Sequence, residues 1–189
     1  MPELFKEMNW LDILFIILFL IIIYDGIRKG MSGQVLPLIG WIAMLFVGVT
    51  FYVPLSKAIF GEKLQKWSLP VSFLIATGGV FIVTRFLSRA MNFKKEGEVS
   101  PVERISGAGI SMLRAALLFG VISMFLLLVP IEEVRSSVTE FSKTAMFFVD
   151  TDAEIYSWMT GYLEAAPKRN KESVVQEFLS PYEKRKDRT

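Results

Sequence analysis

Four long apolar segments alternate with short polar connections along the first 130 residues of the chain. They occupy residues 13–24, 35–53, 71–83 and 115–129. With flanking residues added, each is about long enough to cross the ~30 Å hydrocarbon core of a bilayer as a helix. None alternates polar and apolar residues as a transmembrane β-strand does, and none has the interrupted apolar stripe of a soluble helix. The pattern predicts an all-α membrane protein with four transmembrane helices.

The polar connections set the expected boundaries of these helices. Residues 1–10 form a short N-terminal segment, and residues 11–130 the four-helix transmembrane domain. The first apolar run is expected to be a retained helix and not a signal peptide, because one lysine and two glutamates precede it. Glycines between Asp25 and Gly33 favour a tight hairpin there. The second span is expected to end at Pro54.

Two further features concern the third and fourth spans. Gly78 and Gly79 lie in the middle of the third apolar segment, where they predict either a break in the helix, as at membrane binding sites, or close helix packing. The fourth helix is expected to start near Pro101, well before its apolar part, because residues 105–113 contain no strong helix breaker.

Beyond Pro130 the pattern changes to that of an amphipathic helix over residues 131–166. The apolar residues form one face of this helix, its seam, which only Asp152 interrupts. Two alternatives are open for this face. It packs on protein, which is either the bundle or a partner subunit, or it lies in the membrane interface. Residues 167–189 are rich in Lys, Arg and Glu and predict a flexible charged tail. The other seam residues are Val134, Val138, Phe141, Ala145, Phe148, Ile155, Met159 and Tyr162.

Composition narrows the chemistry. The chain has 189 residues, 52% of them hydrophobic, and contains no histidine and no cysteine. Disulfides, the usual zinc and iron–sulfur ligands and Cys/His nucleophiles are therefore excluded, and so is the side chain that most often carries protons near neutral pH. The net charge of +2 is too small to indicate nucleic acid. We expect no cofactor, no metal, no enzymatic activity and no nucleic-acid partner; the expected partner is the lipid bilayer.

The distribution of Lys and Arg predicts the orientation. Seven such residues flank the first and third connections, against six on the opposite side, so we expect these connections in the cytoplasm and both termini on the outer side of the membrane. The seven are Arg28, Lys29, Arg85, Arg89, Lys94, Lys95 and Arg104, and the six are Lys6, Lys57, Lys63, Lys66, Arg135 and Lys143.

An intramembrane ion pair is expected between Asp25 and Arg114. If the fourth helix starts near Ile105, Arg114 lies ~13 Å along it by the helical rise, deep enough to need a partner. Asp25 lies toward the same side of the membrane. The pair either fixes the fold or lines a path for protons or ions.

Small residues predict a second feature of the fourth helix. Gly107, Ser111 and Ala115 recur every four residues on one face. Such a ridge lets two helices approach closely, so we expect a contact surface there and no chemistry.

Three short stretches carry a family resemblance: Asn9-Trp10-Leu11-Asp12, Ile27-Arg28-Lys29-Gly30 and the run from Glu103-Arg104 through Gly107 and Ser111 to Arg114-Ala115. Together they resemble the colicin V production protein (CvpA) family of bacterial inner-membrane proteins. In the third stretch this chain has Glu103, Ser111 and Ala115 where the family pattern has aspartate, glycine and glycine. Each departure keeps the charge sign or the small size.

The resemblance implies a link to the production or export of a peptide toxin and to maintenance of the bacterial envelope. We therefore expect an integral inner-membrane accessory or scaffold protein, which forms a homo-oligomer or binds other membrane or envelope proteins through the ridge and the amphipathic helix. The alternative is a small oligomeric channel or transporter, with Gly78-Gly79 and the Asp25–Arg114 pair along its route.

Overall fold

The computed structural model describes residues 9–61, 66–90, 100–140, 142–162 and 169–180. These residues form seven helices, of which four are long and apolar enough to cross a membrane. The four are α1 (Trp10–Lys29), α2 (Ser32–Phe60), α3 (Ser68–Ala90) and α4 (Pro101–Leu128). The all-α class and the four candidate spans are thus confirmed, as is the start of the fourth helix near Pro101.

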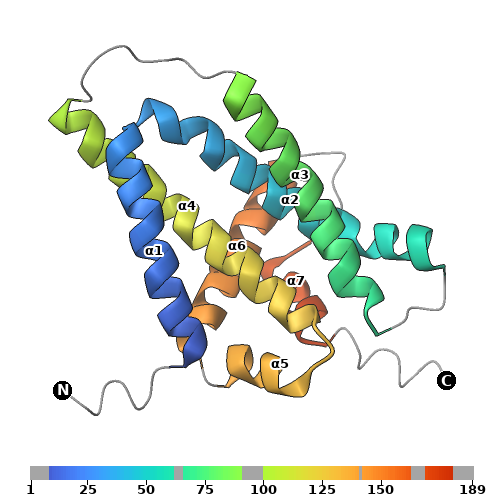
Figure 1. Ribbon diagram of the computed structural model, residues 1–189. Helices are drawn as coiled ribbons and strands as arrows, with labels where there is room; N and C mark the ends of the chain where they lie inside the picture. Colours follow the sequence, from blue (N-terminus) through green and yellow to red (C-terminus); the bar gives the residue numbers. More distant parts are fainter. Residues whose placement is uncertain (1–8, 62–65, 91–99, 141, 163–168, 181–189) are drawn as a thin grey trace, which may run out of the picture.

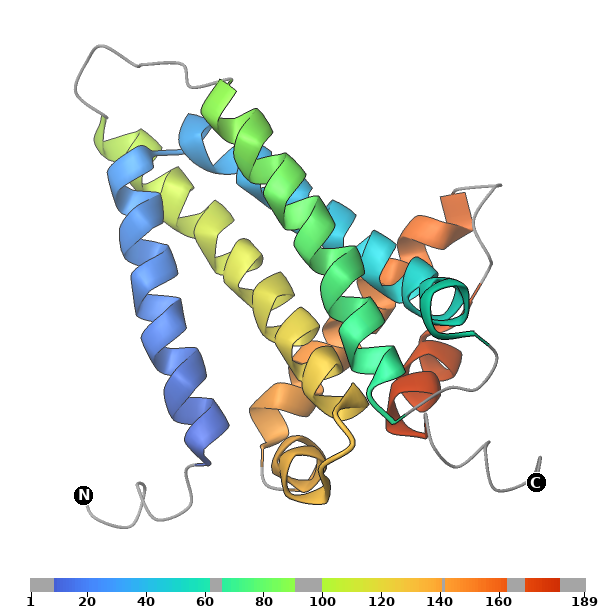
Figure 2. The same cartoon turned by 45° about the vertical axis from the view of Figure 1, so that its right-hand side comes forward.

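The four long helices form two antiparallel pairs, α1 with α4 and α2 with α3 (Figure 1). Helix α4 is the centre of the molecule and contacts each of the other helices. The turn between α1 and α2 lies at the same end of the bundle as the start of α4, and the start of α1 lies at the opposite end, together with the short helix α5 (Glu132–Thr139) (Figure 2).

The first connection is shorter than predicted. Helix α1 runs through Asp25 to Lys29, and α2 starts at Ser32. The turn depends on Gly30, whose φ of 68° is a backbone conformation that glycine adopts at little cost. The turn therefore lies inside the stretch from Asp25 to Gly33 where the hairpin was predicted, but the helices extend into that stretch from both sides. A continuing helix satisfies the backbone hydrogen bonds that hydrocarbon leaves unmet.

Helix α2 also continues beyond its predicted end. It passes through Pro54 and stops at Gly61, whose φ is 72°. A proline inside a helix costs ~3 kcal/mol, but Tyr52 and Ser56 on either side of it are buried against the rest of the protein. That packing holds the helix together across the proline.

The break predicted at Gly78 and Gly79 was wrong. Helix α3 is continuous through them, so they do not break it. A Cβ atom on either glycine would have no neighbour within 4 Å among the described residues, so the close packing expected of them finds no partner in that part of the chain.

The predicted amphipathic helix is two helices, α5 and α6 (Lys143–Tyr162). Ser142 begins the second, because its hydroxyl accepts a hydrogen bond from the backbone N–H of Ala145 at 3.0 Å. Helix α6 passes behind α4 and reaches α2 (Figure 1). Its apolar face, including Val149 and Ala153, is buried on this bundle, which decides between the alternatives in favour of packing on protein. Phe141 of the predicted seam lies outside the described residues.

The predicted charged tail contains a packed helix, α7 (Lys171–Leu179). Val174 and Phe178 of this helix are completely buried, and the Phe178 ring stacks on that of Tyr52 in α2 with centroids 5.2 Å apart. A solvated tail was therefore the wrong prediction for α7. Residues 1–8 of the predicted N-terminal segment and residues 167–168 and 181–189 of the tail lie outside the described residues.

Candidate functional site

A polar cluster lies beside the turn between α1 and α2. Arg114 Nη1 in α4 donates a 2.6 Å hydrogen bond to Gln34 Oε1 in α2, and Gln34 Nε2 donates to Asp25 Oδ2 in α1 at 3.3 Å. Arg114 Nη2 lies 3.5 Å from the same Asp25 oxygen. The structure thus brings Asp25 and Arg114 together, with Gln34 bridging them. Because the side chains of a helix tilt toward its N-terminus, Arg114 reaches from within α4 toward this end of the bundle.

Lys29 completes the cluster from the end of α1. Its ammonium lies 2.8 Å from Asp25 Oδ1, one helical turn away along α1. The side chain of Lys29 is 56% exposed, that of Asp25 is 33% and that of Arg114 is 12%. Burial therefore increases from Lys29 to Arg114, and the one carboxylate is shared by two cations. Such an arrangement ties three helices together and leaves an excess of positive charge.

Helices α1 and α4 approach closely beside this cluster. A Cβ atom on Gly26 would collide with the Ser111 side chain, and one on Gly107 would lie 2.7 Å from the Gly30 carbonyl carbon. Ala115 is completely buried one turn further along α4. The Gly107/Ser111/Ala115 ridge is therefore occupied by this chain's own α1, and the expectation that it contacts a partner protein was wrong.

The opposite end of α1 is held by α5 and α6. Asp12 Oδ1 accepts a 2.7 Å hydrogen bond from the Ser142 hydroxyl, the same group that caps α6. Trp10 Nε1 donates to the Ser137 hydroxyl at 3.2 Å, and the Asn9 side chain donates to the Ser137 carbonyl at 2.7 Å. The Trp10 and Asp12 side chains thus anchor the helices that follow the four long ones.

The remaining predicted motif residues do not join the cluster. Arg28 is exposed, with its guanidinium carbon 5.8 Å from the centroid of the Tyr24 ring. Glu103 caps α4 together with Ser100, and its carbonyl accepts a 3.1 Å hydrogen bond from the backbone N–H of Met31 in the α1–α2 turn. Arg104 is exposed on the first turn of α4.

A cavity of about 270 Å³ adjoins the polar cluster. Its cationic lining comes from Lys29, Arg85 and Arg114, and its apolar lining includes Trp41 and Phe81, whose ring centroids are 6.4 Å apart. Among the described residues Asp25 is the only acidic group that lines it. The cavity therefore combines a positive rim with an apolar wall.

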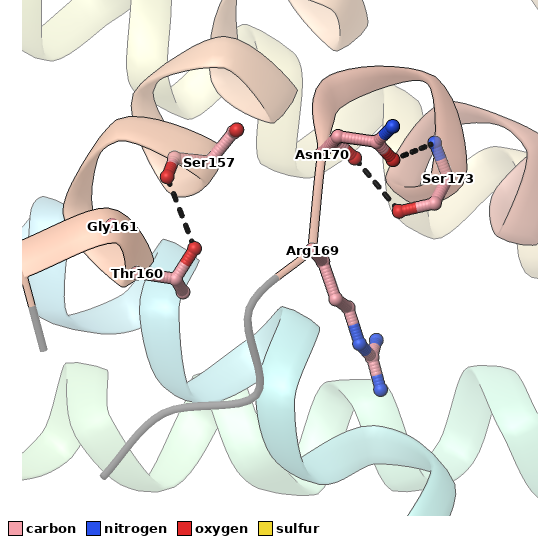
Figure 3. Close-up of a pocket in the computed structure, with 6 residues that line it drawn as sticks. All are labelled: Ser157, Thr160, Gly161, Arg169, Asn170 and Ser173. Carbon is pink, nitrogen blue, oxygen red and sulfur yellow. Dashed lines mark hydrogen bonds between the residues drawn. The ribbon is translucent and has the colours of Figure 1, made fainter. Parts of the chain in front are cut away.

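A second cavity of about 600 Å³ lies between the end of α6 and the start of α7 (Figure 3). Its polar side chains already have partners. Thr160 donates to the Ser157 carbonyl at 3.0 Å, Asn170 caps α7 through the Ser173 N–H at 3.2 Å, and Arg169 donates to Glu177 at 2.8 Å. This cavity is larger, but none of the predicted site residues lines it.

Asp152 lies apart from both cavities. It is completely buried, its carboxylate is in contact with the position where a Cβ of Gly120 in α4 would be, and neither of its oxygens meets a hydrogen-bond donor among the described residues. Burial without a compensating partner raises the pKa of the Asp152 carboxyl well above its usual value. The sequence marked this residue as the interruption of an apolar seam, and the structure places it at the contact of α6 with α4.

Sequence reasoning missed Gln34 and Lys29 as members of the cluster. Gln34 is completely buried, and the signal that could have revealed it is its position as the last polar residue before the second apolar run. Lys29 follows Asp25 by four residues, the spacing at which opposite charges pair on a helix.

The fold defines a multi-pass helical membrane protein with a polar cluster beside the turn between α1 and α2. The family model described as Colicin V production protein matches residues 11–153, which is more than half of the chain. The chain belongs to this bacterial family. No curated protein and no solved structure matched it significantly.

Proposed function

We propose that this protein is a non-enzymatic accessory or scaffold protein of the bacterial inner membrane. The description of its family names production of colicin V. We extend the role to toxin export and to envelope maintenance, as the resemblance implies. Its task in this proposal is to hold other membrane or envelope proteins, or further copies of itself, in place.

The observation that carries the proposal is the closed interior of the bundle. The rings of Phe15 in α1 and Phe119 in α4 stack with centroids 4.5 Å apart, and Phe148 of α6 packs on Phe119 at 5.1 Å. Residues 13–24, 35–53, 71–83 and 115–129 contain no charged side chain. An apolar, aromatic interior supports a scaffold, because a solute or an ion crossing it would lose its hydration without compensation.

The surface offered to a partner is the outer face of α6. The contact ridge of α4 is covered by α1, whereas Phe147, Trp158 and Tyr162 of α6 are 64%, 66% and 75% exposed. Aromatic side chains are enriched at protein interfaces, so this face suits a protein partner.

The alternative is a small oligomeric channel or transporter. Its support is the cationic cavity beside Arg114, which would form the mouth of a route assembled between several copies of the chain. It is the weaker proposal, because the charged side chains of that cavity end where the apolar interior begins.

Two measurements on the purified protein decide between them. Vesicles containing only this protein should show no more flux of K⁺ or protons than protein-free vesicles. Trp158→Ala should reduce recovery of partners co-purified from native membranes in mild detergent, whereas Phe86→Ala, which removes an equally exposed ring from α3 (69% exposed), should not. Protein-dependent flux would refute the scaffold proposal in favour of the channel.

We further propose that both termini lie on the outer side of the membrane, as the distribution of Lys and Arg favours. The chain has no cysteine of its own, so Ser32→Cys at the start of α2 and Glu132→Cys in α5, both at exposed positions, can be labelled with a membrane-impermeant reagent. In intact spheroplasts Glu132→Cys should react and Ser32→Cys should not. The reverse result would invert the orientation.

A further inference from the structure

The cationic cavity at the end of the bundle holds more positive charge than its own acid neutralises. Lys29, Arg85 and Arg114 line it together with the single carboxylate of Asp25, which already pairs with Lys29 and Arg114. No carboxylate among the described residues pairs with Arg85. The cavity therefore carries an uncompensated charge that suits an anion.

The arrangement of donors suits a phosphate group in particular. A guanidinium has five N–H donors in a planar fork that matches phosphate oxygens. Arg114 uses its guanidinium on two partners, Gln34 and Asp25, and Arg85 is exposed at the cavity. Donors from α3 and α4 are thus available to one anion bound between these helices.

The apolar wall distinguishes a lipid from a soluble anion. Trp41 and Phe81 line the same cavity as the cations, and Phe81 is 43% exposed. Further apolar side chains continue outward on α3, where Ile82 and Phe86 are 58% and 69% exposed. A volume of about 270 Å³ is below the range of pockets that enclose a whole drug-sized ligand, so it accommodates a headgroup while acyl chains lie against α3.

The position of the cavity fits this ligand as well. Arg85 and Lys29 lie near the ends of candidate spans α3 and α1, the level at which phospholipid headgroups meet the hydrocarbon. Basic pockets between transmembrane helices at this level recognise anionic lipid headgroups. The geometry points to a binding site for the headgroup phosphate of an anionic phospholipid between α1, α2, α3 and α4.

The test uses the purified full-length protein in a mild non-ionic detergent, with short-chain phosphatidylglycerol as the probe and short-chain phosphatidylcholine as the uncharged reference. Arg85→Gln removes a lining charge that takes part in no ion pair of the described residues. Arg89→Gln is the matched control, because it makes the same change one turn further along the exposed end of α3, outside the cavity. The melting temperature without lipid checks that both variants fold as the wild type does.

We expect saturable binding of phosphatidylglycerol by native mass spectrometry and by lipid-dependent thermal stabilisation. Arg85→Gln should weaken it about tenfold, the loss of one charge-assisted hydrogen bond, while Arg89→Gln leaves it unchanged. Equal weakening in both variants, or absence of saturable binding, would overturn the proposal in favour of general surface attraction. Glycerol phosphate that binds as tightly and displaces the lipid would overturn the lipid assignment in favour of a soluble phosphate ester.

Discussion

Replacement of Asp152 by asparagine is expected to remove a pH-dependent loss of stability. The Asp152 carboxylate is completely buried against Gly120 and meets no donor among the described residues. The helices packed on this face bring no compensating charge, since residues 115–128 of α4 and 35–53 of α2 contain none. Burial therefore raises the pKa of Asp152 in the folded protein, so folding favours the protonated form of this carboxyl.

The sign and size follow from linkage between protonation and folding. A carboxyl whose pKa is raised by folding stabilises the fold fully below the pKa of the unfolded chain, about 3.9. That contribution is lost as the pH rises through the folded pKa, at ~1.4 kcal/mol per pH unit between the two values. As the pH rises from 5 toward the folded pKa, the wild type should therefore lose stability through this group, on the order of 1 kcal/mol for each pH unit. Asp152→Asn does not titrate and should lose none of it.

The assay is thermal or denaturant unfolding in detergent micelles at pH 5, 6, 7 and 8. The informative quantity is the difference in stability between Asp152→Asn and the wild type, which should shift in favour of the variant as the pH rises. The absolute difference also contains the cost of burying an amide, ~1–3 kcal/mol, but that cost does not change with pH. Asp150→Asn makes the same change on the same helix at a position that is not fully buried, and is the matched control.

Parallel stability curves for Asp152→Asn and the wild type across this pH range would refute the reasoning. They would mean that Asp152 is ionised in the folded protein, and hence that a cation or a donor reaches it. A shift in favour of the wild type at high pH would refute it more strongly, because an ionised Asp152 would then be stabilising.

Three further predictions concern the ends of α1. Asp25→Asn and Arg114→Gln should each destabilise the protein by ~1–3 kcal/mol, which is less than the loss from a fully buried pair because Asp25 is 33% exposed. A double-mutant cycle in detergent should show positive coupling between the two changes, and additive losses would mean that the two side chains do not meet. Gly107→Ala should lower the free energy of unfolding by ~1–3 kcal/mol, because its Cβ would meet the Gly30 backbone. Gly109→Ala, whose Cβ would lie in open space, should be neutral or stabilising in the same thermal unfolding assay. Equal effects of the two changes would contradict the close approach of α4 to α1. Asp12→Ala should increase hydrogen exchange at the start of α6, because the contact with Ser142 is lost, and should leave exchange in α7 unchanged. Unchanged exchange at the start of α6 would mean that Asp12 does not hold that helix.

The sequence predicted those parts of the fold that depend on local pattern. Four apolar runs identified the four candidate spans because a helix in hydrocarbon must be apolar along most of its length. The boundaries were predicted less well, because they depend on contacts: Pro54 lies inside α2 between two buried neighbours. Gly78 and Gly79 show the same limit, since only the positions of the other helices reveal that no described residue packs on them.

The region after residue 130 depends still more on tertiary contacts. A charged composition hid α7, although Val174 and Phe178 are spaced one turn apart and Asn170 caps the helix. In the polar cluster, burial depth alone suggested Asp25 as the partner of Arg114, but nothing local indicated that Gln34 would bridge them. The position of Gln34 between Asp25 and Arg114 follows from the short turn that joins α1 to α2.

Helix α1 is held at both ends by polar contacts, and in each contact one partner, Asp12 or Arg114, belongs to the stretches that carry the family resemblance. At one end Asp12 contacts Ser142 at the start of α6, and at the other Asp25 contacts Arg114 in α4. The family match runs from residue 11 to residue 153, so it includes both contacts and also the packing of Asp152 on α4. The match therefore covers the four long helices, α5 and the first half of α6. Helix α7 lies outside the matched residues and is docked on α2 through Tyr52 and Phe178, so its place in this protein rests on that aromatic contact.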